Sequence, residues 1–307
     1  MIQRLLAGLG AVVMIGGSLM MRETLDSRDG GSPADDRVVI VCASDLETYC
    51  DAFGNEVEIR LATAADTAEA IRTGSLPSDI DGWITSSAWL EVLGDTPALG
   101  RSEPLATSPI VVAGLADRAD ALSTLCDGTP IWGCLTESAG LSGTELNVPL
   151  PGVLKVGVPS ANSALGLPVL ASVAAGSLGG VDFASNDFDA PFRANLAALV
   201  GSGAGNDRRP VITMVTQRGR YAAAGTPQAV ITELPPAEVV VFATTPAVAA
   251  TVVLVAFPDG DDLPSTKSVR EALFAAGWAP AAGPAVEPTL GRGVMSALHN
   301  LWLEAIR

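Results

Sequence analysis

The sequence predicts an α/β protein of two lobes, in which the second lobe is inserted into the first. Three observations predict this fold: strand-like and helix-like segments alternate, several strands are continuous β-branched runs as in sheets buried on both faces, and the chain crosses between lobes near residues 105–113 and again near 238–256. Two crossings make the first lobe discontinuous and describe a clamshell. Each lobe is expected to be a mostly parallel sheet flanked by helices, preceded by an N-terminal hydrophobic helix.

Residues 1–25 have the pattern of an export segment. Arg4 precedes an apolar run from Leu5 to Met21, which as a helix is roughly 25 Å long, slightly short of the roughly 30 Å hydrocarbon core of a bilayer. The segment is therefore either a signal peptide or a membrane anchor, followed by a polar linker over 26–37. The absence of a small-x-small cleavage site favours the anchor. Either reading makes the protein extracytoplasmic, membrane-anchored or secreted.

The first part of lobe 1 spans residues 38–108. Ser44-Asp45 is expected to cap the first helix and Thr85-Ser86-Ser87 the third, because short polar side chains accept hydrogen bonds from helix N-termini. The strand–helix order argues for parallel pairing with crossover helices. Strands are expected at 37–43, 56–61 and 79–84, with helices at 46–53, at 66–72 and from the serine pair to Leu93.

Lobe 2 is expected to span residues 109–242, after which the chain returns to lobe 1 over 243–307. The expected strands of this stretch are 154–158, 211–215, 238–243 and 251–257. The expected helices are 119–126, 164–176, 192–200, 268–277 and 293–306.

Charge and cysteine content limit the partners. The net charge of −16 repels phosphate backbones, so no nucleic-acid partner is expected. The four cysteines form two close pairs, Cys42 with Cys50 and Cys126 with Cys134. In an exported chain this spacing favours two disulfides. Free buried thiols are the alternative, and a zinc site is disfavoured because the only histidine, His299, is distant in sequence.

Four segments resemble, in order and spacing, the type II periplasmic binding protein superfamily, the extracellular solute-binding proteins of ABC transporters. Its molybdate-binding branch is the most similar in pattern. The resemblance covers roughly residues 38–305 and implies a two-lobe clamshell, a small-molecule ligand and an ABC permease as partner. The segments are Cys42-Ala-Ser-Asp-Leu46, Asp81-Gly-Trp-Ile-Thr-Ser-Ser-Ala-Trp89, Ala106-Thr-Ser-Pro-Ile-Val-Val-Ala113 and Val156-Gly-Val-Pro-Ser-Ala-Asn-Ser-Ala-Leu-Gly166.

The candidate ligand-binding residues are polar side chains at strand ends where helices begin. Helix N-termini carry unpaired N–H groups and partial positive charge, so together with hydroxyls they can hold a small oxyanion or carboxylate. The alternative is that each residue is only a helix cap. The candidates are Ser44, Asp45, Ser86, Ser87, Ser108, Ser160, Asn162, Ser163, Thr216 and Gln217.

Aromatic and basic residues near these positions have two readings each. Trp83 is expected in the core because its strand neighbours are apolar, whereas Trp89 and Tyr221 could equally stack on an organic ligand. Arg218 and Arg220 are expected at the surface, with pairing to a ligand carboxylate as the alternative.

The expected function is therefore solute binding for an ABC-type importer, with closure of two lobes over a small ligand. The alternative is an extracytoplasmic sensor or assembly domain with the same fold and no transported solute. An exported hydrolase is a third hypothesis, but no catalytic residue, cofactor or metal site is expected. The sequence has no P-loop, HExxH or EF-hand motif, and His299 is not placed as the base of a triad.

Overall fold

The computed structural model describes residues 37–203, 207–258, 263–281 and 292–307. The described residues from 38 onward form one compact unit. The predicted hydrophobic helix lies outside the described residues, as does nearly all of the predicted linker. Among the described helices, none has the length and apolar character needed to cross a bilayer.

Among the described residues, nine strands form a continuous sheet with the order β2-β1-β3-β8-β4-β6-β5, and β7 and β9 also pair with β4. The strands are β1 (Val38–Ala43), β2 (Val57–Ala62), β3 (Gly82–Ser86), β4 (Ser102–Leu115), β5 (Val156–Gly157), β6 (Ala223–Pro227), β7 (Val239–Ala243), β8 (Ala249–Ala256) and β9 (Ala279–Pro280).

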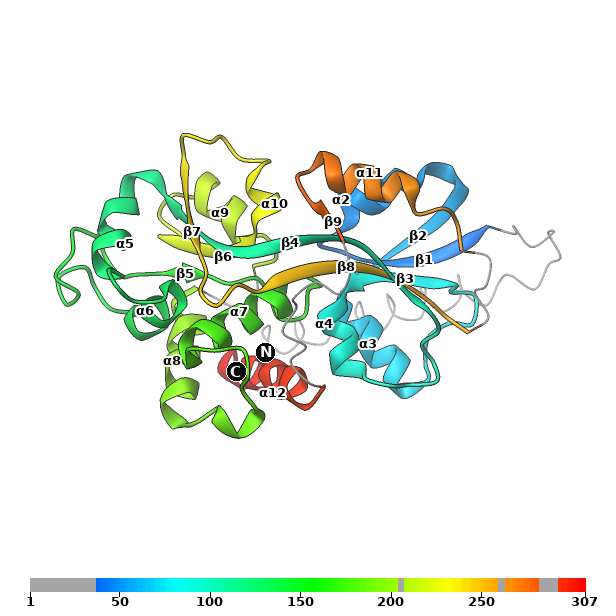
Figure 1. Cartoon of the computed structure of the whole chain (residues 1–307), viewed down its shortest axis with the longest axis horizontal. Helices are drawn as coiled ribbons and strands as arrows, with labels where there is room; N and C mark the ends of the chain where they lie inside the picture. The colour runs from blue at the N-terminus through cyan, green and yellow to red at the C-terminus, as the bar shows by residue number, and fades with distance from the viewer. Residues whose placement is uncertain (1–36, 204–206, 259–262, 282–291) are drawn as a thin grey trace, which may run out of the picture. The chain divides into compact units, whose positions relative to one another are not determined.

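Helices cover both faces of this sheet (Figure 1). The α-helices are α2 (Glu47–Cys50), α3 (Ala64–Thr73), α4 (Ser87–Leu93), α5 (Ala119–Leu125), α6 (Ile131–Ser138), α7 (Gly166–Leu178), α8 (Ala190–Gly203), α9 (Pro210–Thr216), α10 (Gln228–Ile231), α11 (Lys267–Ala275) and α12 (Arg292–Ala305). Short 3-10 turns lie at η1 (Asp51–Glu56), η2 (Ala116–Arg118) and η3 (Ser185–Asp187).

Two long strands, β4 and β8, connect two groups of elements. They pair antiparallel from Ser102↔Val255 to Pro109↔Ala249, and in Figure 1 they run side by side across the middle of the described chain. We call β1–β3 with α2, α3, α4 and α11 the first half, and β5–β7 with α5–α10 the second half. The exact residue boundaries of the two predicted lobes stay a prediction.

The sheet is mixed, which corrects the prediction of mostly parallel lobes. Strands β1, β2 and β3 pair parallel, as do β5 and β6. The strands that connect the halves reverse direction: β8 is antiparallel to β3 and β4, and β4 is antiparallel to β6 and β7. The parallel pairs described here therefore lie within the two halves. β4 and β8, which are far apart in sequence, pair antiparallel along most of the length of β8.

One predicted strand is a helix. Val211–Val215 is β-branched and apolar, but it lies in α9, which begins with Pro210 at its first turn. Proline fixes φ near the helical value and lacks the N–H that would be unpaired there. Val211 and Met214 are buried on one side of this helix. The short apolar run thus follows helical spacing, which periodicity alone does not separate from a strand.

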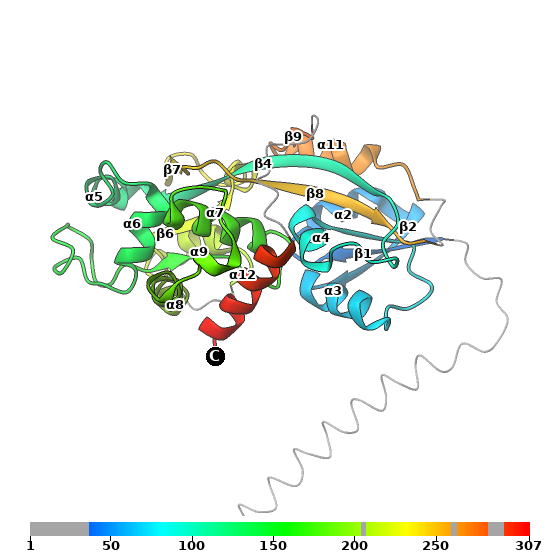
Figure 2. The same ribbon diagram turned by 60° about the horizontal axis from the view of Figure 1, so that its bottom comes forward.

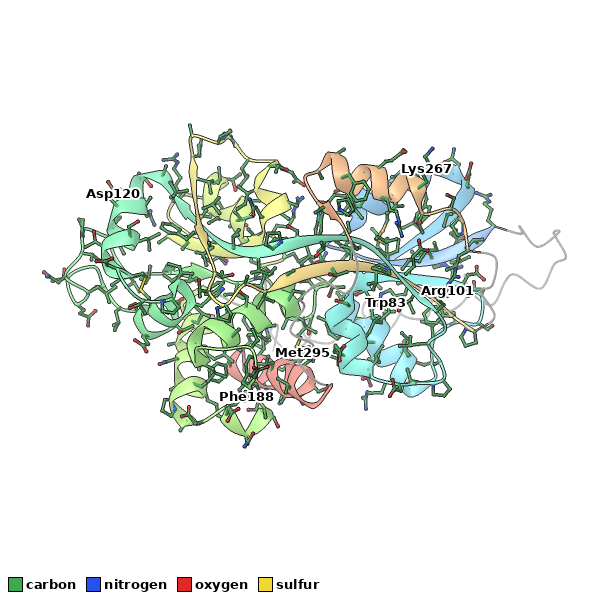
Figure 3. The ribbon with its side chains drawn as sticks, viewed as in Figure 1. Trp83, Arg101, Asp120, Phe188, Lys267 and Met295 are labelled. Atoms are coloured by element: carbon green, nitrogen blue, oxygen red, sulfur yellow. A yellow bond between two sulfur atoms is a disulfide. The ribbon has the colours of Figure 1, made fainter. Side chains whose placement is uncertain are left out.

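The remaining expectations about the core and the cysteines hold. Trp83 is fully buried (Figure 3), as predicted. Cys42 and Cys50 lie 6.5 Å apart at their Cα atoms and Cys126 and Cys134 5.4 Å apart, and each pair is joined by a disulfide. Both predicted pairs are therefore supported.

The C-terminal helix α12 contacts both halves. It packs against α4 of the first half and against α7 and α8 of the second, and Figure 2 shows it between these groups. Its buried residues Met295, Leu298 and Trp302 recur at helical spacing and form one apolar stripe. The stripe packs on both halves and holds them together on this side of the sheet.

Candidate functional site

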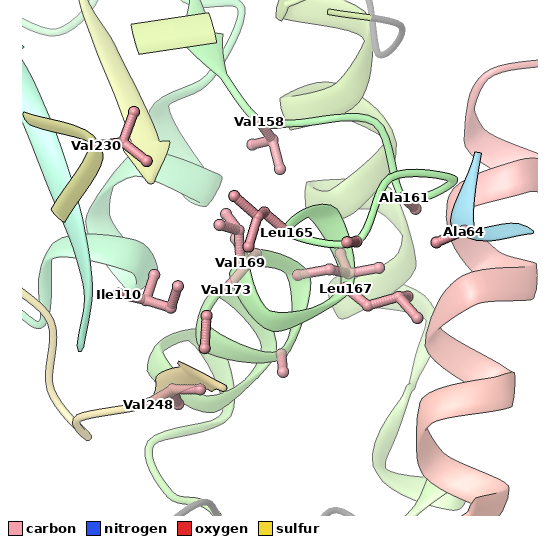
Figure 4. Close-up of a cluster of buried hydrophobic side chains, with 14 of the residues drawn as sticks. Ala64, Ile110, Val158, Ala161, Leu165, Leu167, Val169, Val173, Val230 and Val248 are labelled. Carbon is pink, nitrogen blue, oxygen red and sulfur yellow. The ribbon is translucent and has the colours of Figure 1, made fainter. Parts of the chain in front are cut away.

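One loop of the second half, residues 159–165, reaches the first half, and we call it the bridging loop. It connects β5 to α7. Its Asn162 carbonyl accepts a hydrogen bond from the Ala65 N–H at the start of α3 (3.1 Å). Figure 4 shows Ala161 of this loop facing Ala64, while Leu165 and the first turns of α7 pack into the apolar cluster. The loop therefore lies where the two halves meet.

Asp45 binds the start of α7 across this junction. Its Oδ1 accepts from Ala164 N–H (3.0 Å) and its Oδ2 from Leu165 N–H (2.9 Å). These N–H groups would otherwise be unpaired at a helix N-terminus. The predicted role of Asp45 and Ser44 as caps of the first helix is wrong, since Leu46 is the N-cap residue there and no side chain caps that helix.

Opposing effects act on the pKa of Asp45, and burial is the larger one, so the pKa is raised. Loss of water around its carboxylate raises the pKa above the ordinary value, while the N–H groups of Leu165 and Ala164 and the charge of Arg208 lower it. The carboxylate is the anion that the partial positive charge of α7 attracts. An anion-binding position predicted for a ligand is thus occupied by the protein's own side chain.

Ser86 and Trp89 also bind the bridging loop. The Ser86 Oγ donates to the Ala164 carbonyl (2.5 Å), and the Trp89 Nε1 donates to the Ser163 carbonyl (3.0 Å). Both side chains are buried. Ser86 is the N-cap residue of α4, as predicted, but its hydroxyl makes no capping hydrogen bond. The Trp89 indole N–H is therefore bonded to the bridging loop. Ser87, which begins α4, is partly buried.

Within the loop, Ser160, Asn162 and Ser163 are also engaged. The Ser163 Oγ donates to the Ser160 carbonyl (2.7 Å) and accepts from Gly166 N–H (3.1 Å), and the Ser160 Oγ accepts from Asn162 N–H (3.3 Å). The Asn162 Oδ1 lies 3.1 Å from His299 Nε2 on α12. Burial lowers the pKa of His299, which favours its neutral form.

The other predicted site residues lie elsewhere or act locally. Ser108 in β4 is buried and accepts from Ala229 N–H at α10 (3.0 Å). Thr216 and Gln217 are exposed at the end of α9, where the Thr216 hydroxyl donates to its own helix at Ile212 O (2.9 Å). Their expected place at a strand end is wrong because α9 is a helix. Ser44 donates its backbone N–H to Ala62 O (2.9 Å).

A pocket lies beside Asp45; its cavity volume is about 20 Å³, room for about one water molecule, and the figure rises to about 470 Å³ when the solvent at its mouth is counted. Both halves contribute to it, and we call it the Arg208 pocket. Its charged residues are Asp45, Arg208, Arg209 and Glu233, and its hydroxyl groups come from Thr48, Tyr49 and Thr226. Apolar side chains complete the lining: Pro159, Leu165, Pro210, Val211, Pro227 and Val230.

The backbone at Arg208 is held by the residue before it. The Asp207 carbonyl accepts from Ser160 N–H of the bridging loop (3.0 Å), and the Asp207 Oδ1 accepts from Arg209 N–H (3.0 Å). The Tyr221 hydroxyl lies 3.1 Å from Asp207 Oδ2 and 2.8 Å from the Gly203 carbonyl. Tyr221 is buried and so supports this turn rather than stacking on a ligand.

The two arginines of the pocket differ in their partners. The Arg209 guanidinium pairs with Glu233 (2.6 Å), and Glu233 also accepts from the Tyr49 hydroxyl (3.5 Å). Tyr49 accepts in turn from Trp278 Nε1 (3.2 Å), and burial raises the pKa of its phenol. Arg208 is exposed and forms no hydrogen bond or ion pair with the described part of the chain.

Sequence reasoning missed Arg208 because it treated the following residues as a strand. The available signal was Arg208-Arg209-Pro210, a basic pair before a proline that begins a helix. The basic residues that it did consider behave as expected of the surface: Arg218 forms exposed ion pairs with Glu238 (3.0 Å) and Asp117 (3.5 Å). Arg220 lies over the Tyr221 ring at 5.7 Å.

The Arg208 pocket offers one guanidinium without a partner among described residues, several hydroxyl groups and an apolar wall. Within the described ranges, no group of three or more His, Cys, Asp and Glu side chains is arranged to hold a metal ion.

Solved structures share this fold. The periplasmic binding protein AfuA of Actinobacillus pleuropneumoniae, solved with fructose-6-phosphate, is 13% identical, with a TM-score of 0.58 over 88% of this chain and 98% of that one. A ferric binding protein of Campylobacter jejuni is 10% identical, with a TM-score of 0.52 over 88% and 97%. A periplasmic thiamin binding protein is 11% identical, with a TM-score of 0.54 over 90% and 98%.

Comparison by sequence gives no relative. No family model matches the chain, and no curated protein matches it. The chain therefore has the fold seen in these three binding proteins, a mixed α/β sheet covered by helices, at 10–13% sequence identity.

Proposed function

We propose that the protein is an extracytoplasmic solute-binding protein that closes two halves over a small ligand for an ABC-type importer. Its fold is shared with AfuA, which was solved with fructose-6-phosphate, with a ferric binding protein and with a thiamin binding protein. Two disulfides are typical of oxidising compartments outside the cytoplasm. An N-terminal export segment, as signal peptide or membrane anchor, agrees with that location. In this proposal the protein is not an enzyme.

The observation that carries the proposal is the composition of the Arg208 pocket. Asp45, Thr48 and Tyr49 come from the first half, whereas Arg208 and Val230 come from the second. A ligand in contact with both sets of residues stabilises the closed arrangement by its own binding free energy. The ligand classes within this proposal are a small oxyanion, as in molybdate-binding proteins, and a small carboxylate.

Thermal unfolding of the full-length protein against a broad panel of solutes tests the proposal. The panel comprises inorganic oxyanions, organic acids, amino acids, sugars, sugar phosphates, thiamin and ferric citrate. A true ligand present at 100 times its Kd adds about 2.7 kcal/mol to the free energy of unfolding, which is a clear rise in Tm. Failure of every member at millimolar concentration would remove solute binding.

A second candidate function is an extracytoplasmic sensor or assembly domain without a transported solute. The bridging loop favours it, because Asp45, Ser86 and Trp89 bind that loop directly and so connect the two halves. The apolar stripe of α12 adds a second connection.

Small-angle scattering with and without a stabilising solute separates the two functions. An import receptor becomes more compact on ligand binding, whereas a domain already held closed keeps the same radius of gyration. A permease gene beside this gene would favour import, and a kinase or surface-complex gene would favour the second candidate.

A further inference from the structure

The edge strand β7 of the second half is apolar and exposed. Among the described strands it pairs only with β4, so its other side is a free sheet edge. Val240 and Val241 are 39% and 43% exposed, Ala243 is also exposed, and no residue of Val239–Ala243 is charged. Proteins usually protect such an edge with charged side chains, a proline within the strand or a covering element, because it pairs readily with another strand.

The edge strand β2 of the first half has that protection. Among the described strands it pairs only with β1, and it too has an exposed apolar side chain, Leu61 (46%). Glu58 and Arg60 in the same strand form an ion pair (2.8 Å), and Arg60 also pairs with Asp79 (2.7 Å). A strand added at β2 would have to accommodate these charged groups, whereas β7 carries no charge along its length.

The backbone of β7 offers hydrogen-bonding groups along its free side. The Glu238 carbonyl accepts from the Ala116 N–H just after β4 (3.0 Å). Because successive residues of an antiparallel strand direct their N–H and C=O groups to opposite sides, Val239, Val241 and Ala243 direct theirs away from β4. Within the described part of the chain, these outward groups have no hydrogen-bond partner.

Two copies of β7 are complementary to each other. An antiparallel pair centred on Val241 places this residue opposite its own copy and Val239 opposite Ala243 of the second chain. With two hydrogen bonds for each such residue pair, the contact makes about six in all. It opposes no like charges, because Glu238, the charged residue nearest to the strand, falls opposite Thr244.

The surroundings of β7 limit this assembly to two chains. Pro235 and Pro236 come before the strand and Pro246 after it, and proline has no N–H with which to continue a ladder. Strand β5, at the opposite edge of the second half, has only two residues, and both are buried. A two-fold contact uses the same edge of both copies, so neither β7 stays free to add a third chain.

We propose that β7 is an interface between two copies of this chain, which join edge to edge into one continuous sheet across a two-fold axis at Val241. The contact is one strand wide, which is smaller than the roughly 1,200–2,000 Å² of a stable complex, so the dimer is weak and forms at micromolar concentrations or above. The net charge of −16 on each chain opposes association, and salt screens this repulsion. The inference does not depend on solute binding.

Sedimentation velocity of the full-length protein, from low to high micromolar concentration and at low and high salt, tests the proposal. We expect a dimer whose dissociation constant falls severalfold at high salt. Val241→Lys should raise that constant at least 10-fold, because it places two lysines opposite each other. Leu61→Lys is the matched control, since it adds the same charge at an exposed position of β2 and should change the constant less than 3-fold.

A cysteine cross-link locates the two-fold axis. Val241→Cys places two thiols on paired residues of an antiparallel ladder, whose Cα atoms lie about 5.5 Å apart, within the range that a disulfide spans. On mild oxidation, Val241→Cys chains should link to each other at least 10-fold faster than Leu61→Cys chains.

Each contrary result has a definite meaning. A monomer at every concentration overturns the proposal, as does a dimer that Val241→Lys weakens no more than Leu61→Lys. If Val241→Lys does not fold, the cross-linking rates decide, and equal rates for the two cysteine variants overturn the proposal. A monomer whose β7 edge takes up an extended valine–threonine peptide would assign this edge to a different partner, which also overturns self-association.

Discussion

The bridging loop and the Arg208 pocket lie at the same junction but differ in how their polar groups are used. In the bridging loop, buried donors and acceptors from both halves are paired with one another. In the Arg208 pocket, an exposed guanidinium next to apolar side chains has no partner among the described residues. Serines and helix starts at a junction can therefore be structural, whereas the exposed cation beside them makes no such contact with the described residues.

The close packing of the bridging loop gives the largest expected effect. A Cβ added at Gly166 would overlap the Ser160 carbonyl and lie 3.0 Å from Ala161 Cα, all of it backbone. Gly166→Ala is therefore expected to lower the free energy of unfolding by about 3 kcal/mol. Urea denaturation of both proteins measures the difference.

Gly201→Ala is the control, because Gly201 also lies in a helix but a Cβ there meets nothing within 4 Å. It should raise stability by up to about 1 kcal/mol, since alanine favours a helix over glycine. Equal stability of the Gly166→Ala protein and the parent would show that the loop adjusts freely. The claim that the bridging loop is closely packed would then be wrong.

Removal of the Asp45 carboxylate is the next largest change. Asp45→Ala leaves the N–H groups of Ala164 and Leu165 without acceptors, and we expect a loss of about 2 kcal/mol after relief of carboxylate desolvation. Glu69→Ala removes an exposed carboxylate paired with Arg72 and should cost only about 0.5 kcal/mol. Similar losses in both variants would mean that Asp45 behaves as a surface residue.

The pH dependence of stability gives a finer test of the same carboxylate. Burial raises the pKa of Asp45 above its ordinary value of 3.8, so the folded protein holds this proton more tightly than the unfolded chain. The resulting stability is present below pH 3.8 and is lost as pH rises through the folded pKa. Relative to Asp45→Asn, the parent should thus lose stability with rising pH, by about 1.4 kcal/mol per unit of pKa difference.

His299 should show the opposite sign. Burial lowers its pKa below 6.5, so its contribution is present above pH 6.5 and is lost as pH falls through the folded pKa. Relative to His299→Gln, which can still bond to Asn162, the parent should lose stability between pH 7 and pH 5. Denaturation at several pH values measures both differences, and parallel curves for parent and variant would contradict the corresponding assignment.

The sequence predicted much of the fold because its elements carry local signals. β-Branched runs located β1 and β8, and both cysteine pairs were identified from their spacing. The error at α9 arose where a short apolar run after a proline suits either structure. Strand direction at β4 and β8 could not be predicted, because it depends on which distant segments pair.

The site was harder to predict than the fold. Ser86, Ser163 and Asn162 were selected because polar side chains follow strands, and they do lie at the junction. Sequence alone does not show whether such a group faces a ligand or another part of the chain. At the start of α7 the partner is Asp45, which lies 119 residues from Ala164 in sequence. The signal at Arg208 was the basic pair before Pro210, and it was missed because the residues after it were predicted to be a strand.

The smallest expected effect on stability is at Arg208, and it tests the recognition half of the comparison. Arg208→Gln should change the free energy of unfolding by less than about 0.5 kcal/mol, because an exposed side chain without partners contributes little to folding. Arg209→Gln breaks the pair with Glu233 and should cost about 0.5 to 1 kcal/mol. A loss above about 1.5 kcal/mol in Arg208→Gln would mean that Arg208 mainly compensates Asp45. In that case Arg208 would be a structural residue like Asp45, and the pocket would have no cation available to an anionic solute.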